Sequence, residues 1–185
     1  YKQLGQNDMA LAAIETARAS NPDDAGLIIT AANIYFELDD KEAFKLAMSE
    51  AIEKEPNNPI LYYNLGVVSG ELGEKESART YYEKSIELDP TNENSYLNLV
   101  ALILDGEQEI VNEMNSLGTS RSDNLRYDEL KITREELYKE CVPILKDLIA
   151  ISNDIEAIRT LMNIYGTLGD NPGYMEMKNL LDQLQ

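Results

Sequence analysis

The sequence predicts an all-α protein, a solenoid built from helix-turn-helix repeats. The first observation is a fixed spacing, because Pro22, Pro56 and Pro90 follow one another at intervals of 34 residues. The second is that each proline separates two segments with apolar residues every three to four positions, the period of an amphipathic helix. A proline ends one helix, and the Asn and Asp residues beside it can cap the next. The repeated unit is therefore a pair of helices.

Other positions recur at the same interval of 34 residues. Two sets are small residues that let two helices approach closely: Ala17, Ala51 and Ser85, and Ala32 and Gly66. A third set marks a turn inside each unit: Gly5, Asp39 and Gly73. Close approach of two helices needs a small side chain on one and a large one on the other to fill the space. We therefore expect each helix pair to pack in the same way.

The clearest unit lies between Pro59 and Asn92. Its characteristic residues are Tyr62, Leu65, Gly66, Leu72, Gly73, Ala78, Tyr82, Ser85 and Pro90. This series resembles the tetratricopeptide repeat, whose pattern is W-x₂-L-G-x₂-Y…A-x₃-F…P over about 34 residues. Tyr62 stands in place of the Trp, Tyr82 in place of the Phe, and Ser69 replaces the Tyr. The resemblance implies a right-handed superhelix whose first helices line an inner groove.

In this frame the chain is expected to be one array over 1–185. Residues 1–24 would be the end of a first helix and a complete second helix, with a turn at Gly5. The ranges 25–58 and 59–92 are full repeats, 93–154 is a repeat with an insertion, and 155–185 is a C-terminal repeat with a turn at Gly169. The long-helix unit looks like a variant found in bacterial repeat proteins.

The insertion adds 28 residues to the normal repeat, because the units starting at Glu93 and Ile155 are 62 residues apart. The helical apolar pattern continues on both sides of the Gly118–Asp123 segment. Its members are Tyr96, Leu99, Ile103, Ile110, Met114 and Leu117, then Tyr127, Leu130, Leu137, Cys141, Ile144, Leu148 and Ile151. We expect two lengthened helices that pack as an antiparallel hairpin, with Pro143 as a site for a kink in the second.

Composition excludes several classes of function. The net charge is −18, from 34 acidic and 16 basic residues, so the surface repels nucleic acid and anionic membranes. The chain has no histidine, which removes the commonest general base and metal ligand together, and Cys141 is its one cysteine. The charge is compatible with a preference for basic partners and, more simply, with solubility. No stretch is apolar for long enough to cross a bilayer.

No motif with catalytic or cofactor chemistry is present. The glycines from Gly66 to Gly73 lack the Gly-Lys-Ser/Thr of a phosphate loop and the Gly-x-Ser-x-Gly of a nucleophile elbow. The acidic segment at Asp39 lacks the spacing of a calcium loop, and one cysteine without histidine cannot form the usual zinc site. We therefore expect no catalytic residue, no metal, no cofactor and no enzymatic activity.

The resemblance also implies groove residues, carried over position by position. They are Ile29, Asn33, Phe36, Tyr63, Asn64, Val67, Leu97, Asn98, Ala101, Arg159 and Asn163. Asparagine amides can donate to and accept from a peptide backbone, and aromatic rings supply apolar contact. The alternative is that these are solvated helix residues.

The function expected from these features is a protein-binding scaffold that uses the groove, the hairpin or both. Two alternatives stay open: self-assembly through exposed solenoid ends, and a repeat region within a larger protein. The sequence does not name the partner. It also leaves the compartment open between the bacterial cell envelope, with a leader removed, and the cytoplasm.

One prediction follows from the groove positions alone. Family members that grip C-terminal Glu-Glu-Val-Asp chaperone tails use two asparagines together with several basic residues. Asn33 and Asn64 stand at the matching asparagine positions, but Ile29, Asn94 and Asn98 occupy the basic ones. Without cations to compensate for a desolvated carboxylate, such tails should not bind. Calorimetry at physiological salt tests this, and a micromolar dissociation constant would contradict it.

Overall fold

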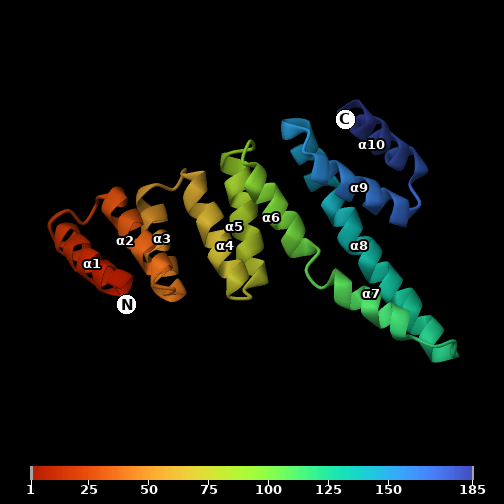
Figure 1. Ribbon diagram of the computed structural model, residues 1–185, viewed down its shortest axis with the longest axis horizontal. Coiled ribbons are helices and arrows are strands. Elements are labelled where there is room, and N and C mark those ends of the chain that lie inside the picture. Colours follow the sequence, from red (N-terminus) through yellow and green to blue (C-terminus); the bar gives the residue numbers. More distant parts are fainter. Residues whose placement is uncertain (1, 185) are drawn as a thin grey trace. The chain divides into compact units, whose positions relative to one another are not determined.

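The computed structural model describes residues 2–184, and the side chains of residues 7–184. That range forms ten helices and no strand, as the all-α prediction requires (Figure 1). The helices are α1 (Lys2–Ser20), α2 (Ala25–Glu37), α3 (Lys41–Lys54), α4 (Pro59–Glu71), α5 (Lys75–Leu88), α6 (Glu93–Ile103), α7 (Glu107–Ser116), α8 (Arg121–Ser152), α9 (Ile155–Leu168) and α10 (Asn171–Leu184). They group into two compact units, Tyr1–Pro90 and Thr91–Gln185.

The first unit stacks α1 to α5 in chain order, each helix packing on the next. Its core joins α2, α3 and α4 through Ile28, Ala32, Phe44, Ala47, Met48, Ala51, Leu61, Leu65 and Val68. The prolines act as expected, since α1, α3 and α5 each end two residues before one of them. The helix pairs α2/α3 and α4/α5 lie within the predicted repeats 25–58 and 59–92.

The turn inside each helix pair has one geometry. Asp39, Gly73 and Gly169 have φ values of 58°, 76° and 73°, the left-handed region that glycine adopts without strain. In each case the next amide donates to a carbonyl five residues earlier, from Asp40 to Tyr35, Glu74 to Ser69 and Asp170 to Tyr165, all at 2.9 Å. These bonds satisfy carbonyl groups left free at a helix C-terminus.

Helix α4 crosses α5 at Gly66. A Cβ atom at this position would lie 2.6 Å from the ring of Tyr82, far inside van der Waals contact. One repeat earlier the equivalent pair is Ala32 and Met48, both fully buried. A small residue on the first helix and a large one on the second thus set the spacing in both pairs.

The predicted turn at Gly5 is wrong. Helix α1 runs without interruption from Lys2 to Ser20 and so includes Gly5. A glycine in a helix has a modest cost in stability, roughly 0.5–1 kcal/mol, which the hydrogen bonds of a continuous helix offset. The repeat spacing therefore placed a turn where none exists.

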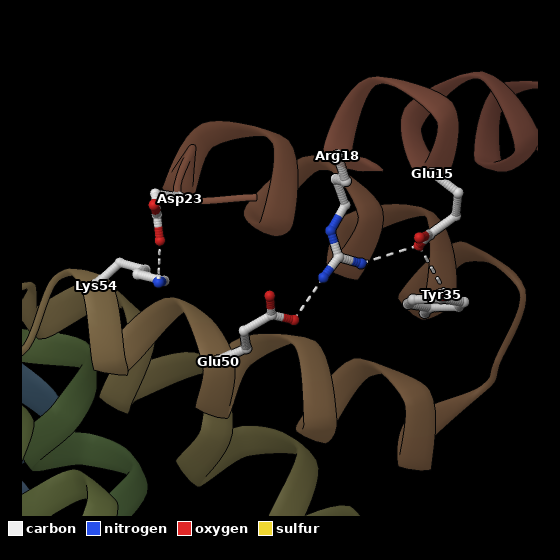
Figure 2. Close-up of polar contacts among 6 residues, drawn as sticks. All are labelled: Glu15, Arg18, Asp23, Tyr35, Glu50 and Lys54. Atoms are coloured by element: carbon white, nitrogen blue, oxygen red, sulfur yellow. Dashed lines mark hydrogen bonds and ion pairs between the residues drawn. The ribbon is translucent and has the colours of Figure 1, made fainter. Parts of the chain in front are cut away.

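Helix α1 packs on α2 through partly buried apolar residues, Leu11, Ile14 and Ala17, and is also held by polar contacts. None of its side chains between residues 7 and 20 is fully buried. Figure 2 shows Arg18 between Glu15 and Glu50, at 2.9 and 2.5 Å, and Lys54 donating to Asp23. The Lys54 ammonium lowers the pKa of Asp23, and the Tyr35 hydroxyl donates to Glu15 at 3.3 Å.

The second unit differs from the expected hairpin in its first arm. Instead of one long helix, α6 ends at Ile103 and α7 begins at Glu107, with Gly106 between them at φ 91°. The apolar spacing continues across the break, which is why periodicity did not detect it. The Asp105-Gly106 pair, a frequent turn sequence, was the signal available.

The second arm is one helix of 32 residues, α8, which continues through Pro143 (Figure 1). It contacts α6, α7 and α9. Its buried residues are Leu130, Tyr138, Cys141, Leu145, Leu148 and Ile149, of which Leu130, Cys141 and Leu148 belong to the predicted apolar series. Tyr127 is 44% exposed rather than part of the inner face, and α7 has no buried residue.

The crossing at Gly66 yields a prediction with an internal control. Gly66→Ala should destabilise the protein by roughly 1–3 kcal/mol, because the new methyl group overlaps the Tyr82 ring. Gly70→Ala, one turn along the same helix, meets its nearest neighbour at 3.9 Å and should stabilise by roughly 0.5–1 kcal/mol. Urea unfolding monitored by circular dichroism measures both, and a stabilising Gly66→Ala would refute the crossing geometry.

Candidate functional site

The first unit has an open hollow between α2 and α4, with α3 as its floor. Its volume is about 270 Å³ and its lining residues are Asn33, Phe36, Phe44, Tyr63, Asn64, Val67 and Val68. Five of these were named from the sequence as groove positions, namely Asn33, Phe36, Tyr63, Asn64 and Val67. The structure brings them together around one space.

Two aromatic pairs shape this hollow. Phe36 on α2 and Phe44 on α3 have ring centroids 5.6 Å apart, tilted by 55°. Phe44 is buried at 3% exposure, while Phe36 is 49% exposed and stands at the opening. Tyr63 lies with its centroid 6.3 Å from that of Tyr82. Rings held in this way offer a rigid apolar surface, which loses little entropy when it is covered.

The hollow also carries free amide groups. Neither Asn33 nor Asn64 has a side-chain hydrogen bond within the described part of the chain. Each amide can both donate and accept. The site therefore combines apolar walls with two groups suited to a peptide backbone, and the lining contains no charged residue.

The remaining predicted positions lie elsewhere. Ile29 packs against the core of the first unit and does not line the hollow. Leu97 and Asn98 are on α6, and Arg159 on α9 pairs with Glu156 at 2.7 Å. Asn163, also on α9, lines a different hollow in the second unit. Phe44 and Val68 were missed, because their positions resemble ordinary core residues.

The second unit's hollow lies among α7, α8 and α9 and measures about 410 Å³. At its edge Glu107 accepts from Arg134 Nε at 2.8 Å and from the Tyr138 hydroxyl at 2.5 Å, and Arg134 Nη2 donates to that hydroxyl at 2.7 Å. Burial and the hydrogen bond to Glu107 raise the pKa of Tyr138. Sequence reasoning did not find this cluster, because its members are 31 residues apart across a break it had not placed.

The thiol of Cys141 is not exposed. Cys141 is fully buried, and this burial raises the pKa of its thiol to about 12, so the thiolate is scarce at neutral pH. Across residues 2–184 the acidic and cysteine side chains form no group of three or more placed to hold a metal ion. In the same range no helix combines the length and apolarity needed to cross a membrane.

Comparison with known proteins agrees with this architecture. The sequence profile of the tetratricopeptide repeat matches residues 60–92. Residues 60–92 thus form a tetratricopeptide repeat, and the fold is that of a solenoid of such repeats, which supports a protein-interaction scaffold in general. No curated protein sequence matches the chain.

Solved structures show the same fold at low identity. A crystal structure of MamA matches with a TM-score of 0.62 and 14% identity, over 97% of this chain and 83% of MamA. A double mutant of MamA RS-1 matches with a TM-score of 0.64 and 14% identity, over 98% of this chain and 86% of that protein. A protein from Bacteroides ovatus, whose description proposes protein binding, matches with a TM-score of 0.62 and 20% identity. The match covers 91% of this chain and 92% of that protein.

The Glu107 cluster generates a prediction about stability. A double-mutant cycle of Glu107→Gln and Arg134→Met should give a coupling energy of about 1–3 kcal/mol, because both side chains are about one quarter exposed and share hydrogen bonds. Lys131 and Glu135, 4.0 Å apart with Lys131 60% exposed, are the control pair and should couple by less than ~0.5 kcal/mol. Chemical denaturation measures both cycles. Equal coupling in the two cycles would show that the cluster does not anchor α7.

Proposed function

We propose that this chain is a non-catalytic scaffold that binds an extended peptide segment of another protein in the hollow between α2 and α4. The single observation that supports this most is the convergence of Asn33, Phe36, Tyr63, Asn64 and Val67 on one open space. These positions come from two successive repeats, so the site exists only because the repeats stack.

The size of the hollow favours one inserted side chain over a whole small molecule. Sites for small molecules commonly have volumes of roughly 300–1,000 Å³ and enclose most of the ligand. At about 270 Å³ and open to solvent, this hollow suits one large apolar side chain of a longer segment. The amides of Asn33 and Asn64 would then hold the backbone beside it.

The experiment selects nine-residue peptides from a random library on the immobilised protein and measures the enriched sequences by calorimetry. We expect a large apolar residue at one position and dissociation constants in the micromolar range, typical of small interfaces. Val67→Arg fills the hollow with a charged chain and Phe36→Ala removes its rim, so each should weaken binding at least tenfold.

Leu46→Arg is the matched control. Leu46 is 74% exposed on α3 and does not line the hollow, so this variant should bind normally. Circular dichroism establishes that all three variants are folded. Peptides that bind Val67→Arg as tightly as wild type would place the site elsewhere.

The hairpin of α7 and α8 is a second candidate surface. Leu125 and Ile132 are 61% and 56% exposed and lie seven residues apart, on one face of α8. Apolar pairs of this kind can dock a partner helix. If Leu125→Ser with Ile132→Ser abolishes capture of a partner that Val67→Arg still captures, the hairpin is the interface.

Self-association is the remaining alternative. Met9 on α1 and Met175 on α10 are 76% and 49% exposed, which supplies apolar surface for it. Light scattering across a concentration series separates this role from peptide binding, because a scaffold that acts through the hollow binds peptide as a monomer.

A further inference from the structure

The groove helices of the first unit have an unusual distribution of charge. Neither α2 nor α4 contains a lysine or arginine. Each carries one acidic residue, in its last turn: Glu37 on α2 and Glu71 on α4. The neighbouring helices α3 and α5 contain six basic residues in all, so among α2 to α5 the two helices that supply most of the lining are the ones without a cation.

The two carboxylates lie at the same end of the hollow. Glu37 follows Asn33 by four residues and Glu71 follows Val67 by four, which is one helical turn of about 5.4 Å on the same helix face. Asn33 and Val67 are equivalent repeat positions and both line the hollow. The residues one turn further therefore stand beside its opening, toward the C-termini of both helices.

The local field at this end favours a cation. The aligned peptide dipoles of a helix give its C-terminus a partial negative charge, which adds to the charge of the side chains. Lys41 pairs with Glu71 at 3.0 Å, and Glu37 accepts a hydrogen bond from the Asn7 amide at 3.0 Å. Asp39 and Asp40 lie in the adjoining turn, so the segment from Glu37 to Lys41 carries three acidic residues and one lysine.

We propose that the segment bound in the hollow carries a lysine or arginine two residues from its apolar anchor, and that this cation pairs with Glu37 and Glu71. The proposal rests on the function proposed above and names the class of partner, a basic segment with an apolar anchor. In an extended peptide, residues i and i+2 point to the same side and are separated by about 7 Å. This separation of about 7 Å is slightly longer than the helical turn of about 5.4 Å between the lining residues and the two glutamates, so a flexible basic side chain can reach the carboxylates.

The charge pattern argues against the opposite partner chemistry. An acidic segment would meet like charge at this end and no cation in the lining of the hollow. Pairs at an exposed rim contribute moderately and are screened by salt. The cation therefore selects among peptides, while the apolar anchor supplies most of the affinity.

The experiment uses three sets of nine-residue peptides with phenylalanine fixed at the centre. They carry lysine, glutamine or glutamate two residues to either side of it and are otherwise identical. On wild-type protein at 50 mM salt we expect roughly a three- to tenfold loss of affinity from lysine to glutamine, and a further loss to glutamate. In the double variant Glu37→Gln with Glu71→Gln, and at 500 mM salt, the three sets should converge.

The control changes net charge by the same amount at a distance. Glu53 and Glu55 are exposed residues at the opposite end of α3 from Lys41 and outside the hollow, and Glu53→Gln with Glu55→Gln should leave the order of the three sets intact. If this control removes the lysine preference as fully as the groove variant does, the preference is a long-range field and the local pairing is overturned.

The remaining outcomes separate the two proposals. If the three sets bind equally and Val67→Arg still abolishes binding, the hollow is a peptide site but the cation proposal is wrong. If Val67→Arg changes nothing, or no set binds, both proposals fail. A lysine preference that depends on both Val67 and the two glutamates supports both.

Discussion

The close crossing of paired helices is the constraint on which the structure of the first unit depends. At Gly66 the backbone of α4 approaches the ring of Tyr82 so closely that no side chain fits between them. In the second unit the glycine is on the second helix of the pair and the ring is on the first. A Cβ at Gly173 on α10 would lie 2.8 Å from the Tyr165 ring of α9. Spacing within a pair then fixes which residues of α2 and α4 are left facing outward, and those residues include the lining of the hollow.

The roles of residues that recur at the same position of each repeat could be predicted from the sequence. The roles of residues that depend on one particular neighbour could not. Asp39 and Gly73 mark real turns because the turn needs the same backbone geometry in every repeat. Gly5 stands at the equivalent repeat position but does not form a turn, because the residues on both sides of it continue helix α1. The same rule named five of the residues that line the hollow between α2 and α4, but not Phe44, because Phe44 reaches the hollow from the second helix of its repeat.

The inserted unit shows why periodicity fails where a chain departs from its repeat. Ile103 and Ile110 keep helical spacing across Gly106, yet the backbone turns there. Once α7 leaves the line of α6, its partners on α8 are set by polar contacts, Glu107 with Arg134 and Glu113 with Arg126. The two hollows consequently differ in chemistry, one walled by aromatic rings and the other edged by a hydrogen-bonded ion pair.

The attachment of α1 has a consequence for motion. Apolar packing of α2 to α5 is little affected by dissolved ions, whereas the ion pair of Arg18 on α1 with Glu50 on α3 weakens as ionic strength rises. We therefore expect α1, which has no fully buried side chain among residues 7–20, to open with a smaller free energy than α3 and α4 and its amides to exchange with solvent first. The Tyr35 hydroxyl donates to Glu15 of α1, so this part of the α2 surface is covered by α1 and is open to another partner only when α1 moves away.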